Sequence, residues 1–351
     1  MERRTIVVTR RLPGVPWDDL AERFRAGDPP KEGTMPREEF LARARGASGI
    51  LCTLADRVDA ELMDAAGPSL SVVSNFAVGV NNVDVPGATR RRIRVCNTPD
   101  VLTDATADLG FALLLSAARK VSDADRFVRA GGWTGWDPWG FLGVPVAGKT
   151  LGIVGMGKIG TAVARRSRGF SMKVLYHNRR RIPPSEEAGL AASYRDLDAL
   201  LAESDFVVLC VPLTRETRGL ISTERLGGMK RTAVLVNIAR GEVVDEEAVA
   251  TALAEGRLFG AGLDVFEKEP RIHPRLLSAP SAVLLPHLGS ATGETREAMG
   301  RLATENLLAV LDGREPPCPS QRRPAARVLS SRFTRLGRMV LQRRQRRPRD
   351  P

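Results

Sequence analysis

The segment from Leu151 to Gly160 constrains the fold of this 351-residue chain most, because there an apolar run meets three spaced glycines. It reads L-G-I-V-G-M-G-K-I-G and contains the pattern Gly155-x-Gly157-x-x-Gly160. The first glycine permits a tight strand-to-helix turn, the second lets the backbone approach a pyrophosphate, and the third lets the helix pack close to the strand. Free N–H groups at the start of such a helix attract phosphate. The segment therefore predicts a dinucleotide-binding turn.

The sequence on either side supports this interpretation over an ordinary βαβ turn without a ligand. Thr150–Val154 has the apolar pattern of a strand, Lys158–Ser167 that of a helix with small packing residues, and Met172–Tyr176 that of a second strand. This order of strand, turn, helix and strand is what the glycine motif requires.

The residues after the second strand indicate which dinucleotide is bound. They are Asn178, Arg179, Arg180 and Arg181, and no acid occurs between Lys173 and Arg181. An acid about 20 residues after the glycines binds the ribose 2′-hydroxyl of NAD, whereas arginine accommodates the 2′-phosphate of NADP. The sequence favours NADP(H), with NAD(H) as the alternative. A merely solvated arginine cluster remains the competing interpretation.

Alternating strand and helix patterns along the chain predict an α/β protein with two doubly wound parallel-sheet domains. The first hundred residues hold four strand patterns, and a second βα series begins at Thr150. Between them lies a continuous helical stretch, Thr103–Ala130, followed by a loop rich in Gly, Pro and Trp. A last helix is expected at Thr295–Asp312, ending at Gly313.

Composition narrows the functional classes. The four cysteines are widely spaced and there are three histidines, so no metal-ligand cluster is visible and a reduced, cytoplasmic setting is expected. The longest apolar stretch, Leu109–Ala118, is about half of what a membrane span needs. The net charge of +12 comes mainly from residues 314–351, which hold 12 arginines against two acids. This basic tail is expected to be disordered, to bind polyanions or to have no specific role.

Three segments after late strands carry the residues that could perform chemistry. The first contains Arg240, the second runs from Gly262 to Pro270 and includes Asp264, and the third contains His287. Ligands of open parallel sheets bind beyond the carboxyl ends of the strands, so these side chains are expected to meet. Arginine matches a carboxylate, and histidine passes protons near neutral pH. A carboxylate beside the histidine would orient its ring, and either Glu267 or Glu269 could fill that role.

These motifs together resemble the D-isomer-specific 2-hydroxyacid dehydrogenase family, most closely its glyoxylate/hydroxypyruvate (2-ketoacid) reductase branch. The resemblance covers about residues 5–313. It is carried by V-G-M-G-K-I-G, by C-V-P-L-T from Cys210, by N-I-A-R-G, by G-L-D-V-F-E-K-E-P and by P-H-L-G-S-A-T. It implies a Rossmann cofactor domain, residues 101–290, inserted in a flavodoxin-like substrate domain, residues 1–100 and 291–313.

The resemblance also implies a role for each matched residue. Arg240 would bind the substrate carboxylate, His287 would donate the proton in reduction, and Glu269 would be its partner. The backbone N–H groups of Val78 and Gly79 would meet the carboxylate, and Asp264 would contact the nicotinamide carboxamide. Cys210 departs from the pattern, because many members carry histidine there. The expected cofactor-binding residues are Thr103, Gly155, Gly157, Lys158, Ile159, Gly160, Asn178, Arg179, Arg180, Cys210, Pro212, Ile238, Ala239, Asp264 and Gly289.

The resemblance implies an NADPH-dependent reductase of a small 2-keto acid (glyoxylate, hydroxypyruvate or 2-ketogluconate) and a homodimer joined by the crossover helix and the following loop. Trp133, Trp136, Trp139 and Phe141 of that loop would narrow the pocket or pack at the interface. One alternative is an NAD-linked enzyme like phosphoglycerate dehydrogenase. Another is a dinucleotide-sensing corepressor that uses the Arg-rich tail on nucleic acid, whereas the nearly neutral body is not expected to bind nucleic acid.

Overall fold

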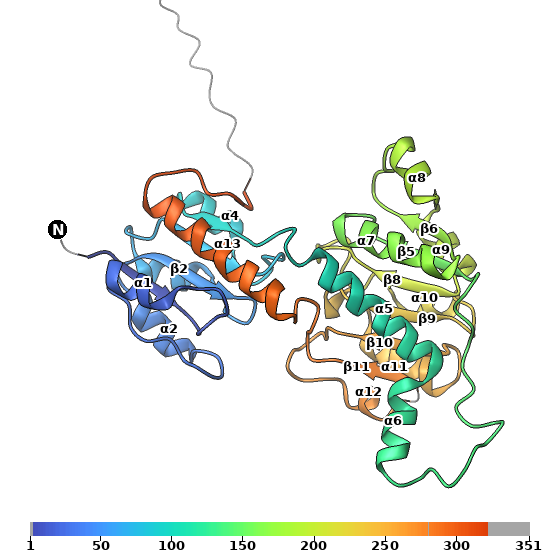
Figure 1. Ribbon diagram of the computed structural model, residues 1–351. Helices are drawn as coiled ribbons and strands as arrows, with labels where there is room; N and C mark the ends of the chain where they lie inside the picture. The colour runs from blue at the N-terminus through green and yellow to red at the C-terminus, as the bar shows by residue number, and fades with distance from the viewer. Residues whose placement is uncertain (1–2, 280, 322–351) are drawn as a thin grey trace, which may run out of the picture.

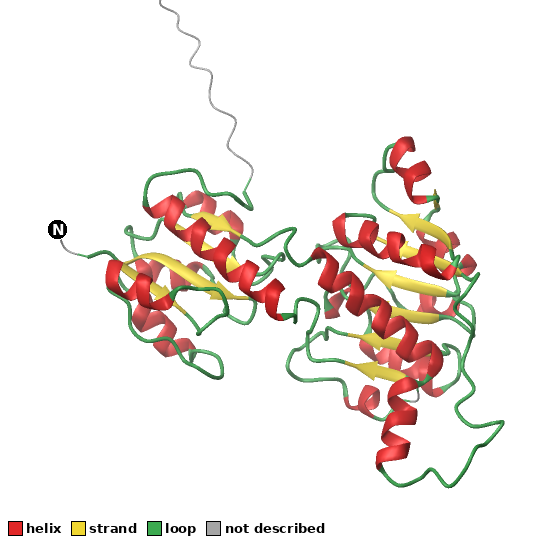
Figure 2. Cartoon of the chain, in the orientation of Figure 1, coloured by secondary structure: helices red, strands yellow, loops and turns green. Residues whose placement is uncertain are grey.

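The computed structural model describes residues 3–279 and 281–321, which form two α/β domains, each built on its own parallel sheet (Figures 1 and 2). One sheet has four strands and the other has seven. The two doubly wound domains that the alternating pattern predicted are therefore confirmed. No helix among the described residues is long and apolar enough to cross a membrane.

The four-stranded sheet forms the core of the first domain. Its strands lie in the order in which they occur in the chain: β1 (Thr5–Val8), β2 (Ala47–Thr53), β3 (Val72–Phe76) and β4 (Arg94–Cys96). Arg25, which follows β1 and α1 in the chain, forms a parallel bridge with Thr5 on the open edge of β1. With this segment counted as the second strand, the spatial order is 2-1-3-4-5, as in a flavodoxin-like sheet. All residues of β2 and β3 are buried, because helices cover both faces.

The helices of this domain come from both ends of the chain. They are α1 (Trp17–Arg23), α2 (Arg37–Ala44), α3 (Ala60–Ala66), α4 (Val85–Arg90) and α13 (Gly293–Leu311). Helix α13, orange in Figure 1, lies on the sheet among the blue and cyan elements, and Leu307 and Leu311 pack in one core with Leu51 and Val72. A Cβ on Gly49 would lie 2.7 Å from Leu307, so this glycine permits the close approach.

The chain does not leave the first domain at Gly313, and this corrects the expected start of the tail. Cys318–Gln321 pair with β4: the Asn97 N–H donates to the Cys318 carbonyl at 3.2 Å, and the Ser320 N–H donates to the Val95 carbonyl at 2.8 Å. A segment can pair with an open sheet edge without an apolar pattern, so the composition of these residues did not indicate the pairing. The rest of the predicted tail, residues 322–351, lies outside the described residues.

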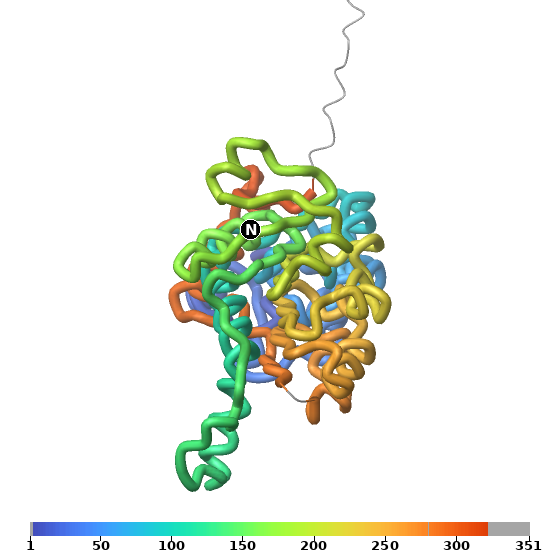
Figure 3. Tube along the Cα trace, turned by 90° about the vertical axis from the view of Figure 1, so that its right-hand side faces the viewer, coloured from blue at the N-terminus to red at the C-terminus, as the bar shows by residue number. Residues whose placement is uncertain are grey.

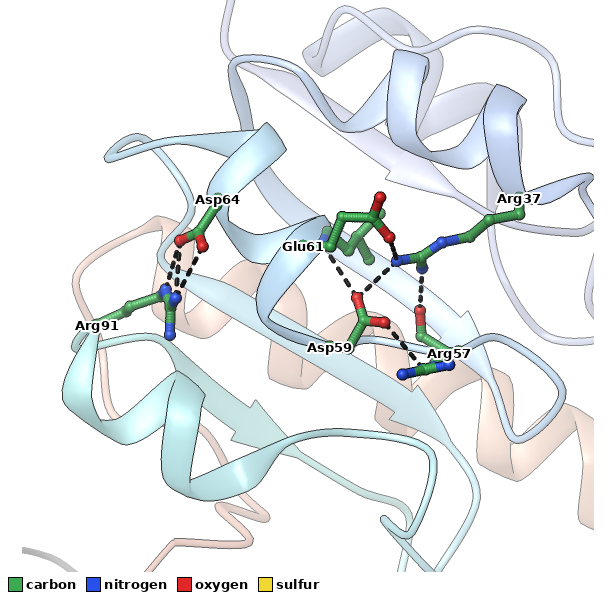
Figure 4. Close-up of polar contacts among 7 residues, drawn as sticks. Arg37, Arg57, Asp59, Glu61, Asp64 and Arg91 are labelled. Atoms are coloured by element: carbon green, nitrogen blue, oxygen red, sulfur yellow. Dashed lines mark hydrogen bonds and ion pairs between the residues drawn. The ribbon is translucent and has the colours of Figure 1, made fainter.

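Ion pairs join three surface helices of the first domain (Figure 4). Asp59 caps α3, and Arg37 of α2 pairs with Asp59 at 2.6 Å and with Glu61 at 2.7 Å. Arg91, at the end of α4, pairs with Asp64 of α3 at 2.8 Å. Burial raises the pKa of Asp59, but the hydrogen bonds from Arg37 and the Leu62 N–H, with the charges of Arg37 and Arg57, together outweigh it, and the pKa is lowered. Exposed pairs of this kind contribute little stability singly, so their main effect is to fix the helix orientations.

The seven-stranded sheet carries the dinucleotide motif. Its spatial order is β11-β10-β9-β8-β5-β6-β7, and all neighbours are parallel. The strands are β5 (Thr150–Val154), β6 (Lys173–His177), β7 (Ala192–Tyr194), β8 (Phe206–Leu209), β9 (Val234–Asn237), β10 (Gly260–Leu263) and β11 (Ala282–Leu284). The order reverses between β5 and β8, and ligands of such sheets bind in the crevice at that point.

Helices cover both faces of this sheet and enclose two apolar cores. They are α5 (Thr103–Arg119), α7 (Lys158–Ser167), α8 (Pro184–Leu190), α9 (Leu197–Glu203), α10 (Thr223–Gly227), α11 (Glu246–Ala254) and α12 (Pro274–Leu277). The strand and helix patterns did not predict β7, α8 or α12, which are only three to seven residues long. So short an element shows too little periodicity to be recognised.

The predicted continuous helix Thr103–Ala130 is wrong in one respect. Lys120 adopts a left-handed conformation with φ of 53°, so α5 ends and a separate helix, α6 (Val121–Arg129), begins. Helix α6 has no buried residue and projects from the body together with the loop that follows it (Figures 1 and 3). The helical pattern continues through the break, so periodicity alone could not locate it.

Candidate active site

The glycine turn has the geometry that a pyrophosphate-binding loop needs. Gly155 has φ of 103°, a conformation that side chains disfavour, and its N–H donates to the His177 carbonyl at 2.9 Å. A Cβ on Gly160 would lie 2.2 Å from the Gly155 carbonyl oxygen, so only glycine lets α7 pack this closely. A Cβ on Gly157, in contrast, would meet no atom within 4 Å. The open face at Gly157 and the N-terminus of α7 fit a dinucleotide phosphate.

Of the four polar residues after β6, Asn178 and Arg181 form hydrogen bonds within the protein, whereas Arg179 and Arg180 do not within the described residues. The Asn178 side chain accepts a hydrogen bond from the Met156 N–H at 2.7 Å and so ties this strand to the glycine turn. Arg181 forms a two-pronged pair with Glu187, at 2.6 and 2.7 Å. That pair, together with the Tyr176 hydroxyl, lowers the pKa of Glu187 to about 2.

The side chains of Arg179 and Arg180 are available to bind a ligand. Both are exposed, and within the described parts of the chain neither donates a hydrogen bond or forms an ion pair. Hydrogen bonds from Thr214 and from the Glu216 backbone lower the pKa of Glu216, and the positive charge of Arg179 adds a smaller lowering. These two guanidinium groups, which follow β6, are therefore available to a ligand, whereas Arg181 is already engaged by Glu187.

Arg240 meets the first domain immediately after β9. Its guanidinium is half-buried, and Nη1 donates to the Ala239 carbonyl at 2.6 Å. The Asn237 side chain donates to the Arg240 carbonyl at 2.9 Å and holds the turn. A Cβ on Gly79 would lie 1.9 Å from Nη2 of Arg240, so the predicted substrate loop lies against this guanidinium. Burial lowers the pKa of Arg240, yet an arginine remains a cation at neutral pH.

His287 and Glu269 form the proton-transfer pair that the sequence suggested. Nδ1 of His287 lies 2.9 Å from Oε2 of Glu269, and Oε1 of Glu269 accepts the Phe266 N–H at 3.1 Å. Burial raises the pKa of Glu269, but the hydrogen bond with His287, the Phe266 N–H and the charge of Arg240 together lower it. With Glu269 ionised on the Nδ1 side, Nε2 of His287 is left to exchange a proton with a ligand.

Glu269, rather than Glu267, is therefore the acid beside the histidine. Glu267 instead forms a reciprocal clamp with Glu246 at the start of α11. The Glu246 N–H donates to Glu267 at 3.2 Å, and the Glu267 N–H donates to Glu246 at 2.5 Å. A Cβ on Gly241 would lie 1.8 Å from the Phe266 carbonyl carbon, so the Arg240 turn and the Glu269 turn are in direct contact. Sequence reasoning did not identify this clamp.

Asp264 holds the histidine loop in place. It is buried, and its two carboxylate oxygens accept the Leu288 N–H at 2.6 Å and the Gly289 N–H at 2.8 Å. Its carbonyl accepts the His287 N–H at 2.9 Å, and His287 has φ of 56°. Burial is the main cause of the raised pKa of Asp264. The structure thus gives this residue a positioning role, besides the expected contact with nicotinamide, which stays a prediction.

One cavity of about 830 Å³ lies between the two domains and brings most of the predicted site together. The predicted residues that line it are Val78, Gly79, Thr103, Gly157, Lys158, Ile159, Cys210, Pro212, Ile238, Ala239, Arg240, Asp264, His287 and Gly289. Those outside its lining are Gly155, Gly160, Asn178, Arg179, Arg180 and Glu269. A second hollow of about 500 Å³ continues along the N-terminus of α7, past Gly157 and Lys158.

Apart from the loop that carries Val78 and Gly79, sequence reasoning missed the part of the cavity wall that the first domain supplies. That part includes Arg10, Arg11, Leu12, Leu54, Asn81, Arg296 and Met299. These residues lie in the turns after β1, β2 and β3 and on α13. No motif marks them. The one available signal is that Arg296 follows His287 by nine residues, at the start of a helix that leads away from the site.

Fold and site together define an oxidoreductase that binds a nicotinamide dinucleotide, and comparison with known proteins identifies its family. Residues 111–289 match the family model of the NAD binding domain of D-isomer specific 2-hydroxyacid dehydrogenases. A glyoxylate reductase of Thermococcus kodakarensis is 51% identical over 319 residues, which cover 90% of this chain and 95% of the relative. The chain belongs to the D-isomer specific 2-hydroxyacid dehydrogenase family.

Solved structures agree with this assignment. A glyoxylate reductase from Paecilomyes thermophila superposes with a TM-score of 0.82 at 36% identity, covering 91% of this chain and 99% of that one. An NADPH-dependent glyoxylate/hydroxypyruvate reductase from Sinorhizobium meliloti, in complex with NADP and malonate, gives a TM-score of 0.80 at 36% identity. That match covers 91% of this chain and 97% of the other. The resemblance stated from the motifs is confirmed.

Proposed function

We propose that this protein uses NADPH to reduce glyoxylate to glycolate and hydroxypyruvate to D-glycerate. The observation that carries the proposal is that Arg240 and His287 line one cavity that also reaches the glycine turn, with Glu269 2.9 Å from Nδ1 of that histidine. The names of the Thermococcus kodakarensis and Sinorhizobium meliloti relatives support the choice of substrate. A bound nicotinamide would supply the hydride, which no side chain can provide.

In this proposal the protein's own residues bind and polarise the keto acid and deliver the proton. Arg240 pairs with the substrate carboxylate, and the backbone N–H groups of Val78 and Gly79 donate to the same group. As the carbonyl carbon is reduced, negative charge develops on its oxygen, and Nε2 of His287 donates a proton there to form the hydroxyl. Glu269 stabilises the imidazolium before that transfer and keeps the ring oriented.

A substrate panel tests the proposed function. Full-length protein is mixed with glyoxylate, hydroxypyruvate or 2-ketogluconate and with NADPH or NADH, and the near-ultraviolet absorbance of the reduced cofactor is followed. We expect absorbance to fall with glyoxylate and hydroxypyruvate, and to fall faster with NADPH. Absence of oxidation with every keto acid and both cofactors would contradict the proposal.

The cofactor preference has a direct test at Arg179 and Arg180. Replacing them together (Arg179→Asp with Arg180→Ala) is expected to lower kcat/KM with NADPH by about tenfold or more, because charge-assisted hydrogen bonds to phosphate contribute about 1.5–3 kcal/mol. The rate with NADH is expected to be unchanged or to rise. The matched control is Arg168→Ala, an exposed arginine that donates to the Gly189 carbonyl. An unchanged NADPH-to-NADH ratio would show that these arginines do not bind the 2′-phosphate.

We also propose a homodimer, and the segment that supports it is the projecting arm, which consists of α6 and the loop after it (residues 121–142). Its helix and loop expose a set of large apolar side chains: Val121, Phe127, Val128, Trp133, Trp136, Trp139, Phe141 and Leu142. Trp136 is 85% exposed, and Figure 3 shows the arm standing clear of the body. So many exposed aromatic and aliphatic side chains in one segment are typical of a surface that another protein covers.

Charge on this arm is expected to separate the subunits. The double change Val128→Glu with Trp136→Glu places two carboxylates among these apolar side chains, and burying an unpaired charge is costly. Light scattering coupled to size-exclusion chromatography is expected to show a dimer for the wild type and a monomer for the variant. A wild-type monomer at the concentrations of the assay would contradict the proposed dimer.

A further inference from the structure

One guanidinium group on the active-site cavity, that of Arg296, has no role in the chemistry described above. It lies in the first turns of α13 and lines the same cavity as Arg240 and His287. Its side chain is only partly exposed, and it forms no hydrogen bond or ion pair within residues 3–279 and 281–321. Its donors on the cavity side are therefore available to a ligand oxygen.

The other cations that line this cavity already have partners. Arg10 donates to the Gly33 carbonyl, with Nε at 2.7 Å. Arg11 pairs with Asp28 at 3.0 Å and lies over the ring of Trp17. Lys158 pairs with Asp100. Apart from Arg240, which the substrate carboxylate occupies in the proposed function, Arg296 is thus the arginine or lysine that the described lining leaves available.

Close backbone packing fixes the part of α13 that carries Arg296. A Cβ on Gly14 would lie 2.0 Å from the Glu297 carbonyl oxygen, and a Cβ on Gly300 would lie 1.9 Å from the Pro13 carbonyl oxygen. The turn after β1 therefore rests directly on this part of the helix. Met299, one helical turn after Arg296, also lines the cavity. The guanidinium is consequently presented from a rigid wall, which is the arrangement that substrate discrimination needs.

We propose that Arg296 binds an oxygen substituent on C3 of the substrate, and that it selects 2-keto acids with a C3 hydroxyl over those with a C3 methyl. The inference rests on the proposed 2-keto acid reduction. In the proposed function Arg240 binds the C1 carboxylate and His287 donates a proton to the oxygen on C2. The guanidinium of Arg296, on the same cavity, is then available for a substituent on C3. A site that donates hydrogen bonds to a substrate oxygen rejects the analogue without it, because the donor is then left unpaired.

Three keto acids separate this role from a structural one. Hydroxypyruvate carries the C3 hydroxyl, pyruvate has a methyl in its place, and glyoxylate has no C3. For Arg296→Met we expect kcat/KM for hydroxypyruvate, relative to pyruvate, to fall by about 10- to 100-fold. Turnover of glyoxylate is expected to stay within about threefold, since nothing on that substrate reaches Arg296. Arg296→Lys, which keeps one donor and the charge, is expected to retain part of the preference.

The control is Arg301→Met on the same helix, because Arg301 is exposed and pairs with Glu297 at 3.5 Å. It is expected to leave all three substrates unaffected. An equal loss on hydroxypyruvate, pyruvate and glyoxylate in Arg296→Met and Arg296→Lys, or an unchanged hydroxypyruvate-to-pyruvate ratio, would overturn the inference while the proposed function stands. If the wild type reduces none of the three acids, the proposed function itself fails, and the inference fails with it.

Discussion

His287→Ala is expected to lower kcat for reduction of glyoxylate by about 10²–10⁴-fold, the range over which a positioned acid or base contributes. The imidazole is held by Glu269 at Nδ1, at 2.9 Å, so its removal deletes the proton donor without disturbing the glycine turn. Fluorescence titration with NADPH should accordingly give a Kd within a few-fold of the wild type. A variant that keeps its turnover would show that the proton comes from another group.

Glu269→Gln is the companion to this variant. Glutamine keeps the size of the side chain and an oxygen for the Phe266 N–H, but it removes the charge that favours the imidazolium. We expect a smaller loss of kcat than for His287→Ala, and nearly no further loss when the two changes are combined, because the two residues act as one unit. Losses that simply multiply in the double variant would contradict the paired role.

Arg240→Lys is expected to produce the second large effect, a fall in kcat/KM for glyoxylate of about 30-fold to several thousand-fold. Truncating one member of a buried, hydrogen-bonded charge pair costs about 2–5 kcal/mol, and lysine cannot reproduce the planar fork that matches a carboxylate. Lysine keeps the positive charge, so the comparison isolates geometry. Steady-state kinetics and a Kd for NADPH separate substrate binding from cofactor binding.

A matched control distinguishes this effect from a general loss of arginine. Arg231→Lys changes an exposed arginine whose Nε donates to the Gly256 carbonyl at 3.2 Å, well away from the lining of the cavity. Its kcat/KM is expected to equal that of the wild type. If Arg240→Lys behaves like Arg231→Lys, Arg240 does not bind the substrate carboxylate.

The parts of the fold that local sequence determines could be predicted. The glycine turn is local, because a left-handed Gly155 and a close-packed Gly160 are needed whatever the rest of the chain does. The ends of β9, β10 and β11 could be placed at one sheet edge because the strands are parallel and each is followed by an unusual polar residue. That reasoning brings Arg240, His287 and either Glu267 or Glu269 together, and the structure places Glu269 beside the histidine.

Features that depend on contacts between distant segments could not be predicted. The helix break at Lys120 occurs inside an unbroken helical pattern. The pairing of Cys318–Gln321 with β4 uses backbone groups and the Gln321 side chain, which no local pattern marks. The clamp between Glu246 and Glu267 joins residues 21 positions apart through peptide N–H groups. Arg296 was missed for the same reason, since only the packing of α13 on the first domain brings it to the cavity. The sequence could not distinguish Arg181 from Arg179 and Arg180, because all three are arginines. Only the structure shows that Arg181 pairs with Glu187.

The most direct test of the account is the identity and stoichiometry of the product formed from hydroxypyruvate. Full-length protein is incubated with hydroxypyruvate and NADPH, the oxidation of the cofactor is followed, and the glycerate is resolved by chiral chromatography. The account predicts one D-glycerate for each NADPH oxidised, and no such product with His287→Ala over the same period. Formation of L-glycerate, or no oxidation of NADPH or NADH, would contradict it.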